Sequence, residues 1–286
     1  MVNFAKFLLV TLTFLFGASS FALDSKAPWC GDSSKYKDNS GFSGYDYESK
    51  KYPGKPIRYR LKRPEKLEKG KKYPLHLHLH GMGKRGSDNG KQVGRANNIY
   101  NKYKENGQLI YSMAPQATDW HEGLNQATQE PGSTISAILE VIQNLIKNEQ
   151  VDADRVYISG NSMGGVCVAL YVKFGISVDP KGLFAAASPV ACMGDGNPTD
   201  YMLTVPFHGF LGEKESRRRN RAMYKMKEVY DSKEAYMELT IIKGTGHSNT
   251  FPKALDILVP WLLKQKRGQN IKKIVTEKGI MEVHKE

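Results

Sequence analysis

Short apolar runs alternate with helical patterns along the chain from residue 70 onward. The clearest helix lies before Arg155, where apolar residues from Ile135 to Ile146 recur at helical spacing after Pro131 and Gly132. Strands that alternate with helices are typical of an α/β domain built on a mostly parallel sheet. The apolar runs predict strands at Tyr73–Leu79, Leu109–Ala114, Arg155–Ser159, Leu183–Val190, Val205–Leu211 and Met237–Ile242.

The same patterns favour one domain over most of the chain. Alternating residues at Ile57–Leu61 predict antiparallel edge strands for the segment 24–60. The chain has no internal repeat and no long linker, so a single domain is expected over residues 23–267. The charged segment 268–286 is predicted to be a surface tail.

The first residues have the pattern of a cleavable secretory signal. Met1–Ala22 carries one basic residue, Lys6, followed by an apolar run from Phe7 to Phe16 and small residues that end at Ala22. This pattern predicts cleavage after Ala22 and a secreted or periplasmic protein. An uncleaved membrane anchor is the alternative, but the apolar run is too short to span a bilayer comfortably.

Composition and charge narrow the classes of function. The 286 residues are 40% apolar, which excludes a disordered chain, and 42 basic against 29 acidic residues give a net charge of +13. Such a charge attracts nucleic acids or anionic surfaces. Export argues against nucleic acid, and loose association with anionic surfaces is the expectation that remains. The oligomeric state stays open.

The three cysteines allow one disulfide in an oxidising compartment. Cys167 stands among apolar residues and is predicted to be a buried thiol, while a bridge between Cys30 and Cys192 remains open. None of the three has the spacing of a metal ligand.

The most informative stretch joins the predicted strand at Arg155–Ser159 to a helical pattern through the sequence Gly-Asn-Ser-Met-Gly at Gly160–Gly164. A G-x-S-x-G motif between a strand and a helix is a nucleophile elbow, whose glycines allow a sharp turn that exposes the serine hydroxyl. Ser162 is therefore the candidate nucleophile, and Gly165 favours close packing of the following helix. The alternative is a structural turn that has lost its chemistry.

A serine needs a base to accept its proton and a carboxylate to orient that base. After a nucleophile elbow the acid follows the serine in the chain and the histidine comes last. His247 is the predicted base because it lies in a glycine-containing loop after the Met237–Ile242 strand. His208 is predicted to pack within a strand, and His284 lies in the charged tail.

The sequence offers three candidates for the acid of the predicted triad. No aspartate occupies the loop after the Val205–Leu211 strand, and Glu215 takes the expected position after Gly212. Glutamate is chemically adequate for orienting a histidine. Glu213 and Asp195 remain competitors for the role.

An oxyanion hole needs two backbone amides aimed at the developing negative charge. Met163, directly after the nucleophile, and Met82, in the glycine-rich loop after Tyr73–Leu79, are the predicted donors. Gly81 in the same loop is a candidate substrate contact. Trp120 and Arg217 are further candidates, and their alternatives are an exposed loop tryptophan and a solvated helix start.

His76, His78 and His80 alternate in a predicted strand and so share one face. Neighbouring side chains on one face of a strand lie about 7 Å apart, too far for three imidazoles to share a zinc ion without strain. These histidines are therefore expected to pack or to support other residues. No metal site is predicted.

The motifs at Tyr73–Asn89, Ala114–Gln116 and Asp152–Gly165 together resemble secreted α/β-hydrolases of the esterase, phospholipase and polyhydroxybutyrate-depolymerase-like group. The resemblance extends from about residue 45 to residue 267. It implies an α/β-hydrolase fold and a serine hydrolase of carboxylic esters without metal or organic cofactor. It carries over to Ser162, His247 and the His80–Gly83 loop but does not settle the acid.

The sequence therefore predicts an exported serine hydrolase of small-molecule or polymeric esters, acting through an acyl-enzyme on Ser162. Some relatives are peptidases, so a peptidase with the same triad is one alternative. The other is a catalytically silent binding protein that uses its positive charge to hold an anionic polymer or surface.

Overall fold

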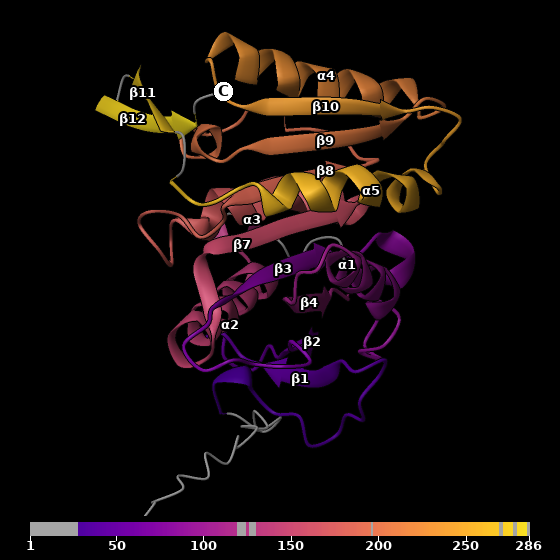
Figure 1. The fold of residues 1–286 in the computed structure, drawn as a ribbon, viewed down its shortest axis with the longest axis vertical. Helices are drawn as coiled ribbons and strands as arrows, with labels where there is room; N and C mark the ends of the chain where they lie inside the picture. The colour runs from indigo at the N-terminus through magenta and orange to yellow at the C-terminus, as the bar shows by residue number, and fades with distance from the viewer. Residues whose placement is uncertain are drawn as a thin grey trace, which may run out of the picture.

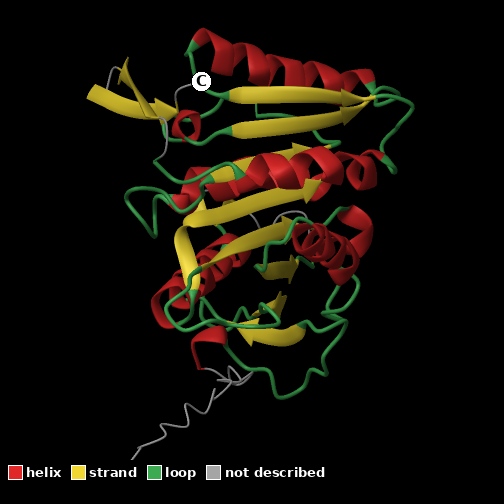
Figure 2. Ribbon diagram, in the orientation of Figure 1, coloured by secondary structure: helices red, strands yellow, loops and turns green. Residues whose placement is uncertain are grey.

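An eight-stranded sheet runs through the centre of the protein in the order β1-β2-β4-β3-β7-β8-β9-β10. Figure 2 shows its strands in yellow, with helices in red beside them. The computed structural model describes residues 28–118, 124–125, 130–195, 197–268, 271–276 and 279–284. The two pairs β1/β2 and β2/β4 are antiparallel, and the remaining neighbours in the sheet are parallel. The strands are β1 (Ser43–Tyr47), β2 (Ile57–Lys62), β3 (Tyr73–Leu79), β4 (Tyr111–Gln116), β7 (Val151–Asn161), β8 (Ala186–Val190), β9 (Phe207–Gly212) and β10 (Met237–Ile242).

This sheet confirms the predicted fold class, including the antiparallel strands at its N-terminal edge. Each predicted strand is present, with shifts at the ends. β9 begins at Phe207 rather than at Val205, and the reason is Pro206, which has no amide hydrogen for the strand ladder. β7 begins at Val151, four residues before the predicted start.

Helices cover both faces of the sheet (Figure 1). Apolar residues of α1 and α5 pack in one core cluster, and those of α2, α3 and α4 pack in another. Successive residues of β7 pack on opposite faces of the sheet. Tyr157 packs in the cluster with α1 and α5, and Ile158 packs in the cluster with α2, α3 and α4. The helices are α1 (Val93–Glu105), α2 (Ser133–Asn148), α3 (Met163–Gly175), α4 (Arg217–Ser232) and α5 (Thr250–Leu263).

The two ends of the chain differ in what is described. The predicted signal Met1–Ala22 lies outside the described residues. The C-terminal segment, predicted as a surface tail, contains an antiparallel strand pair, β11 (Ile271–Thr276) and β12 (Gly279–His284).

Among the helices of the described residues, none has the length and apolar character needed to cross a membrane. Shorter elements are η1 (Pro28–Cys30), η2 (Met82–Lys84), η4 (Met202–Thr204), β5 (Leu124–Asn125) and β6 (Glu130–Pro131).

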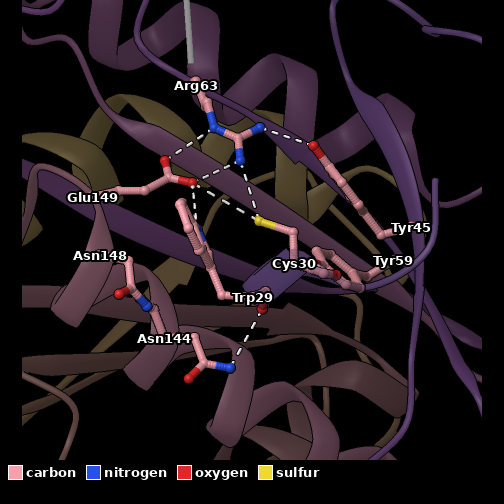
Figure 3. Close-up of polar contacts among 8 residues, drawn as sticks. All are labelled: Trp29, Cys30, Tyr45, Tyr59, Arg63, Asn144, Asn148 and Glu149. Carbon is pink, nitrogen blue, oxygen red and sulfur yellow. Dashed lines mark hydrogen bonds and ion pairs between the residues drawn. The ribbon is translucent and has the colours of Figure 1, made fainter. Parts of the chain in front are cut away.

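A buried ion pair fastens the N-terminal segment to the end of α2 (Figure 3). Arg63 donates from Nε to Glu149 Oε2 at 2.9 Å and from Nη2 to Oε1 at 2.7 Å. Trp29 Nε1 donates to Glu149 Oε1 at 3.1 Å, and Arg63 Nη1 donates to the hydroxyl of Tyr45 at 2.9 Å. Burial alone would lower the pKa of Arg63, but the hydrogen bonds and charge of Glu149 raise it.

Cys30 belongs to this cluster and is not part of a disulfide. Its Sγ lies 3.2 Å from Arg63 Nη2, and burial raises the pKa of the thiol to about 11. Cys192 instead packs against Gly165 at the start of α3, so the two sulfurs belong to different parts of the fold. All three cysteines are free thiols, and the bridge between Cys30 and Cys192 is not formed.

Replacing Glu149 by glutamine is expected to lower the free energy of unfolding by about 3 kcal/mol, because it leaves the buried Arg63 without its counter-charge. Urea denaturation followed by circular dichroism measures the change. The matched control is Glu68→Gln, which breaks an exposed pair with Lys71 at 3.1 Å and should cost less than about 1 kcal/mol. Equal losses in the two variants would contradict a special role for the buried pair.

Candidate active site

Ser162 is the single residue that connects the end of β7 at Asn161 to the start of α3 at Met163. Its backbone has φ 55° and ψ −117°, a strained conformation for a residue with a side chain. The Ser162 amide donates to the carbonyl of Val190 at 2.9 Å, and its carbonyl accepts from the amide of Val166 at 3.2 Å. Neighbouring strand and helix therefore hold the strained turn from both sides.

Glycine is required at the positions of the motif because neighbouring atoms leave no room for a Cβ. A Cβ at Gly164 would lie 2.1 Å from the carbonyl oxygen of Leu79, and one at Gly160 would lie 2.3 Å from that of Gly164. A Cβ at Gly165 would lie 2.7 Å from the sulfur of Cys192. The helix can thus approach the strand ends this closely only with glycine at these positions.

Three side chains from separate parts of the chain form one line of hydrogen bonds. Ser162 Oγ lies 2.9 Å from His247 Nε2, and His247 Nδ1 lies 2.8 Å from Glu215 Oε2. Glu215 follows β9 and His247 follows β10, so both lie beyond the carboxyl ends of parallel strands. These distances are those of a nucleophile, its base and the acid that orients the base.

The carboxylate of Glu215 is held in its ionised form. Burial alone would raise its pKa, but hydrogen bonds from His247, the Ser216 amide and Arg219 together lower it. The Ser216 amide and Arg219 Nη1 both donate to Oε1 at 2.9 Å, which leaves Oε2 for the histidine. The Glu215 side chain is 1% exposed, so water does not compete for these oxygens.

The competing residues have other partners. Glu213 Oε2 accepts from the amide of Gly244 at 2.8 Å, and Asp195 Oδ1 accepts from the amide of Asn197 at 2.9 Å. His208 is buried in β9, where its Nε2 lies 2.8 Å from Thr240 Oγ1. Burial lowers the pKa of His208 to about 4, against the opposing effect of the nearby Glu238.

The predicted oxyanion donors lie at the starts of two helical segments. Met163 is the first residue of α3, and Met82 is the first residue of η2. The amide of a first helical residue has no carbonyl partner within its own helix, so it is available to a substrate. The α3 dipole adds positive potential at the same place.

His80 holds the loop that carries Met82, and the sequence did not reveal which contacts it makes in this supporting role. The amide of Ala117 donates to His80 Nε2 at 3.0 Å, which places the ring hydrogen on Nδ1. Nδ1 in turn donates to the carbonyl of Gly81 at 2.8 Å. A Cβ at Gly81 would lie 2.8 Å from Asn161 Nδ2, so the loop passes directly beside the nucleophile elbow.

A cavity of about 630 Å³ opens beside Ser162 and His247. Gly81 and Met82 line it, as expected for residues that face the substrate. Trp120, the other loop candidate, lies outside the described residues.

The structure does not bring Arg217, the predicted substrate contact, to the cavity. Arg217 is exposed at the start of α4 and is not among the described residues that line the cavity, whereas Arg219 is. Two residues along a helix differ in direction by about 200°, so the two arginines point away from each other. Arg219 stands four residues after Glu215, and this spacing is the signal by which the ion pair could have been found.

The alternating histidines of β3 are structural. His76 Nε2 and His78 Nδ1 lie 2.8 and 3.0 Å from the same hydroxyl, Ser159 Oγ on β7. His76 Nδ1 also lies 3.1 Å from the hydroxyl of Tyr103. Burial lowers the pKa of His76 to about 3, so its ring stays neutral. The described residues contain no cluster of acidic, histidine and cysteine side chains suited to a metal ion.

The fold and this site define a serine hydrolase of the α/β-hydrolase type. Comparison with family models then identifies the family. The chain belongs to the prolyl oligopeptidase family, whose model matches residues 116–279, more than half of the chain. A comparison with curated proteins finds no match.

Solved structures confirm the predicted resemblance to esterase-like α/β-hydrolases at the level of the fold. A thermostable esterase is 24% identical with a TM-score of 0.67, over 79% of this chain and 64% of its own length. An S-formylglutathione hydrolase from Staphylococcus aureus is 16% identical with a TM-score of 0.59, over 78% and 98%. A poly(3-hydroxybutyrate) depolymerase from Bordetella parapertussis is 16% identical with a TM-score of 0.56, over 77% and 88%.

Proposed function

We propose that the protein hydrolyses carboxylic esters through an acyl-enzyme on Ser162. The observation that carries the proposal is the unbroken hydrogen-bonded line from Ser162 through His247 to Glu215. A serine hydroxyl becomes a competent nucleophile only when a positioned base accepts its proton. The esterases and the depolymerase among the structural neighbours support ester hydrolysis, although at their identities they share only the fold.

In the first half of the reaction, Ser162 Oγ bonds to the ester carbonyl carbon while its proton passes to His247 Nε2. The amides of Met163 and Met82 stabilise the negative charge on the carbonyl oxygen. The bond to the alcohol then breaks, and the alcohol leaves with the proton from His247. Water attacks the acyl-enzyme by the same relay, which releases the acid and restores the Ser162 hydroxyl.

Glu215 acts on His247 Nδ1. Its carboxylate accepts a hydrogen bond from Nδ1–H, which keeps that hydrogen on Nδ1 and leaves Nε2 unprotonated and directed at Ser162. The same negative charge stabilises the imidazolium that forms when Nε2 takes the serine proton. The low pKa of Glu215 serves this role because the carboxylate remains ionised at neutral pH.

A peptidase with the same residues is the second candidate, favoured by the family match. The two activities differ in the leaving group, since an amine must be protonated before it departs and an alcohol departs more easily. Parallel assays of p-nitrophenyl esters and of peptide p-nitroanilides separate them. If the anilides are cleaved faster than the esters, the proposed substrates are peptides and not esters.

Ser162→Ala is expected to lower ester turnover by several orders of magnitude, because the nucleophile and base act as a unit. p-Nitrophenyl acetate hydrolysis measures the loss, and a fluorescent fluorophosphonate should label the wild type at Ser162 but not the variant. Circular dichroism of both proteins controls for folding. An unlabelled, folded wild type would instead favour the silent binding protein.

Glu215→Gln is expected to lower turnover by a factor on the order of 10³ to 10⁴, because an amide can hold His247 in the wrong tautomer and cannot balance the imidazolium charge. Glu213→Gln removes the same charge two residues away on the exposed side of the loop and should change turnover by less than about threefold. The ratio of kcat between the two variants is the measurement. Comparable losses in both would remove Glu215 from the proposed triad.

We also propose that the protein is exported, on the basis of the Met1–Ala22 pattern. The mature protein is then expected to begin at Leu23. Mass spectrometry of the N-terminal peptide, taken from protein secreted by a host with an active export system, measures this. Recovery of the intact Met1 terminus in the membrane fraction would favour the uncleaved anchor.

A further inference from the structure

The cavity beside Ser162 is lined by positive charge. Its basic lining residues are Lys84, Lys91, Arg95 and Arg219, and no aspartate or glutamate of the described residues lines it. Arg219 is already paired with Glu215, and Lys91 Nζ lies 3.0 Å from Asp88. Arg95 differs from these two residues because it has no such partner, and it differs from Lys84 because Lys84 is exposed whereas Arg95 is partly buried.

Arg95 is the third residue of α1, and its side chain is partly buried. Within the described residues it has no carboxylate at ion-pair distance and no hydrogen-bond acceptor. Burial lowers its pKa, yet a guanidinium remains charged in proteins. A positive charge in the first turn of a helix is also opposed by the helix dipole. The fold therefore keeps a cation here at a cost to stability.

The position of this cation is set by Phe251, near the start of α5. The guanidinium carbon of Arg95 lies 5.1 Å from the centroid of the Phe251 ring. Phe251 follows His247 by four residues, and its ring centroid lies 4.9 Å from that of His78, another lining residue. The guanidinium lies over this ring, and its N–H groups have no hydrogen-bond acceptor among the described residues, so they are available to a ligand.

We propose that Arg95 binds an anionic group of the substrate, a carboxylate or a phosphate, and so makes the enzyme selective for esters that carry one. The inference rests on the proposed function of Ser162 and names the substrate class for that site. Arginine suits the role because its planar fork donates two parallel hydrogen bonds to either oxyanion. The positive lining lowers the cost of bringing such a group out of water.

The test compares matched pairs of charged and neutral esters. p-Nitrophenyl hydrogen adipate and p-nitrophenyl hexanoate share an acyl chain length and differ in a terminal carboxylate. The acetate ester of glycerol 3-phosphate and glycerol monoacetate differ in a phosphate on the alcohol side. In one of the two pairs, the wild type should have a higher kcat/KM for the charged ester than for the neutral one. A preference in the first pair indicates that Arg95 binds a carboxylate, and a preference in the second indicates a phosphate.

Arg95→Gln is expected to reduce that preference by about ten- to a hundredfold, the range of a hydrogen bond between charged groups. Arg95→Lys should retain part of the preference, because it keeps the charge without the fork. The control is Arg218→Gln, which removes an equal charge from an exposed position on α4 outside the cavity lining and should leave the preference unchanged. Equal rates for both members of both pairs, or a preference that survives in Arg95→Gln, would overturn the inference.

A binding measurement separates this inference from the proposed chemistry. Ser162→Ala protein is titrated by calorimetry with monomethyl adipate and with glycerol 3-phosphate, which requires no turnover. Binding of either compound that is weakened at least tenfold by adding Arg95→Gln supports the anion site even if no ester is cleaved. Failure of both compounds to bind, or binding that is unaffected by Arg95→Gln, counts against the site even if neutral esters are cleaved.

Discussion

The close contact between α3 and the ends of β3 and β7 is the constraint on which the active site depends. A Cβ at Gly164 would lie 2.1 Å from the Leu79 carbonyl, so backbone touches backbone with no side chain between them. Leu79 is the last residue of β3 and leads directly into the loop of Met82. One contact thus sets the position of Ser162 relative to the loop of Met82, and the strain at Ser162 accompanies it.

The parallel sheet then brings the acid and the base to the nucleophile. Ser162, Glu215 and His247 follow β7, β9 and β10, and β8 lies between β7 and β9. Parallel strands end at the same edge of a sheet, so loops far apart in sequence meet there. Val190 at the end of β8 binds the Ser162 amide, which ties the elbow to the strand beside it. The C-terminal part of β7 and all of β8 and β9 are buried, so the strands beneath Ser162 and Glu215 are closely packed.

Much of this arrangement could be predicted from the sequence, because its main signals are local. Apolar runs marked the strands, and the G-x-S-x-G turn with the chain order of its partners indicated Ser162 and His247. The chain order left Glu215, Glu213 and Asp195 open as the acid. The sequence pointed to Arg217 rather than to Arg219, because the exact start and rotation of α4 decide which arginine faces the cavity. Local patterns also do not reveal contacts between distant segments.

Arg95 shows most clearly what such patterns miss. Its significance depends on Phe251, 156 positions away in the sequence, and on the absence of a carboxylate among its described neighbours. The same holds for Arg63 and Glu149, whose pairing joins β2's end to that of α2. In a basic sequence, the pattern alone does not distinguish paired charged residues from unpaired ones. Only the fold shows which of them lack a counter-charge.

The positive cavity also bears on the chemistry at His247. In the proposed reaction the imidazole would become positively charged inside a lining that already carries Arg95 and Arg219. Glu215 offsets this charge on one side, but it is shared with Arg219, which binds its other oxygen. A substrate anion on Arg95 would remove one of the opposing cations from the balance. Binding such a substrate would therefore also favour the imidazolium. In this way the proposed selection of the substrate by Arg95 and the proposed proton transfer by His247 would be coupled electrostatically.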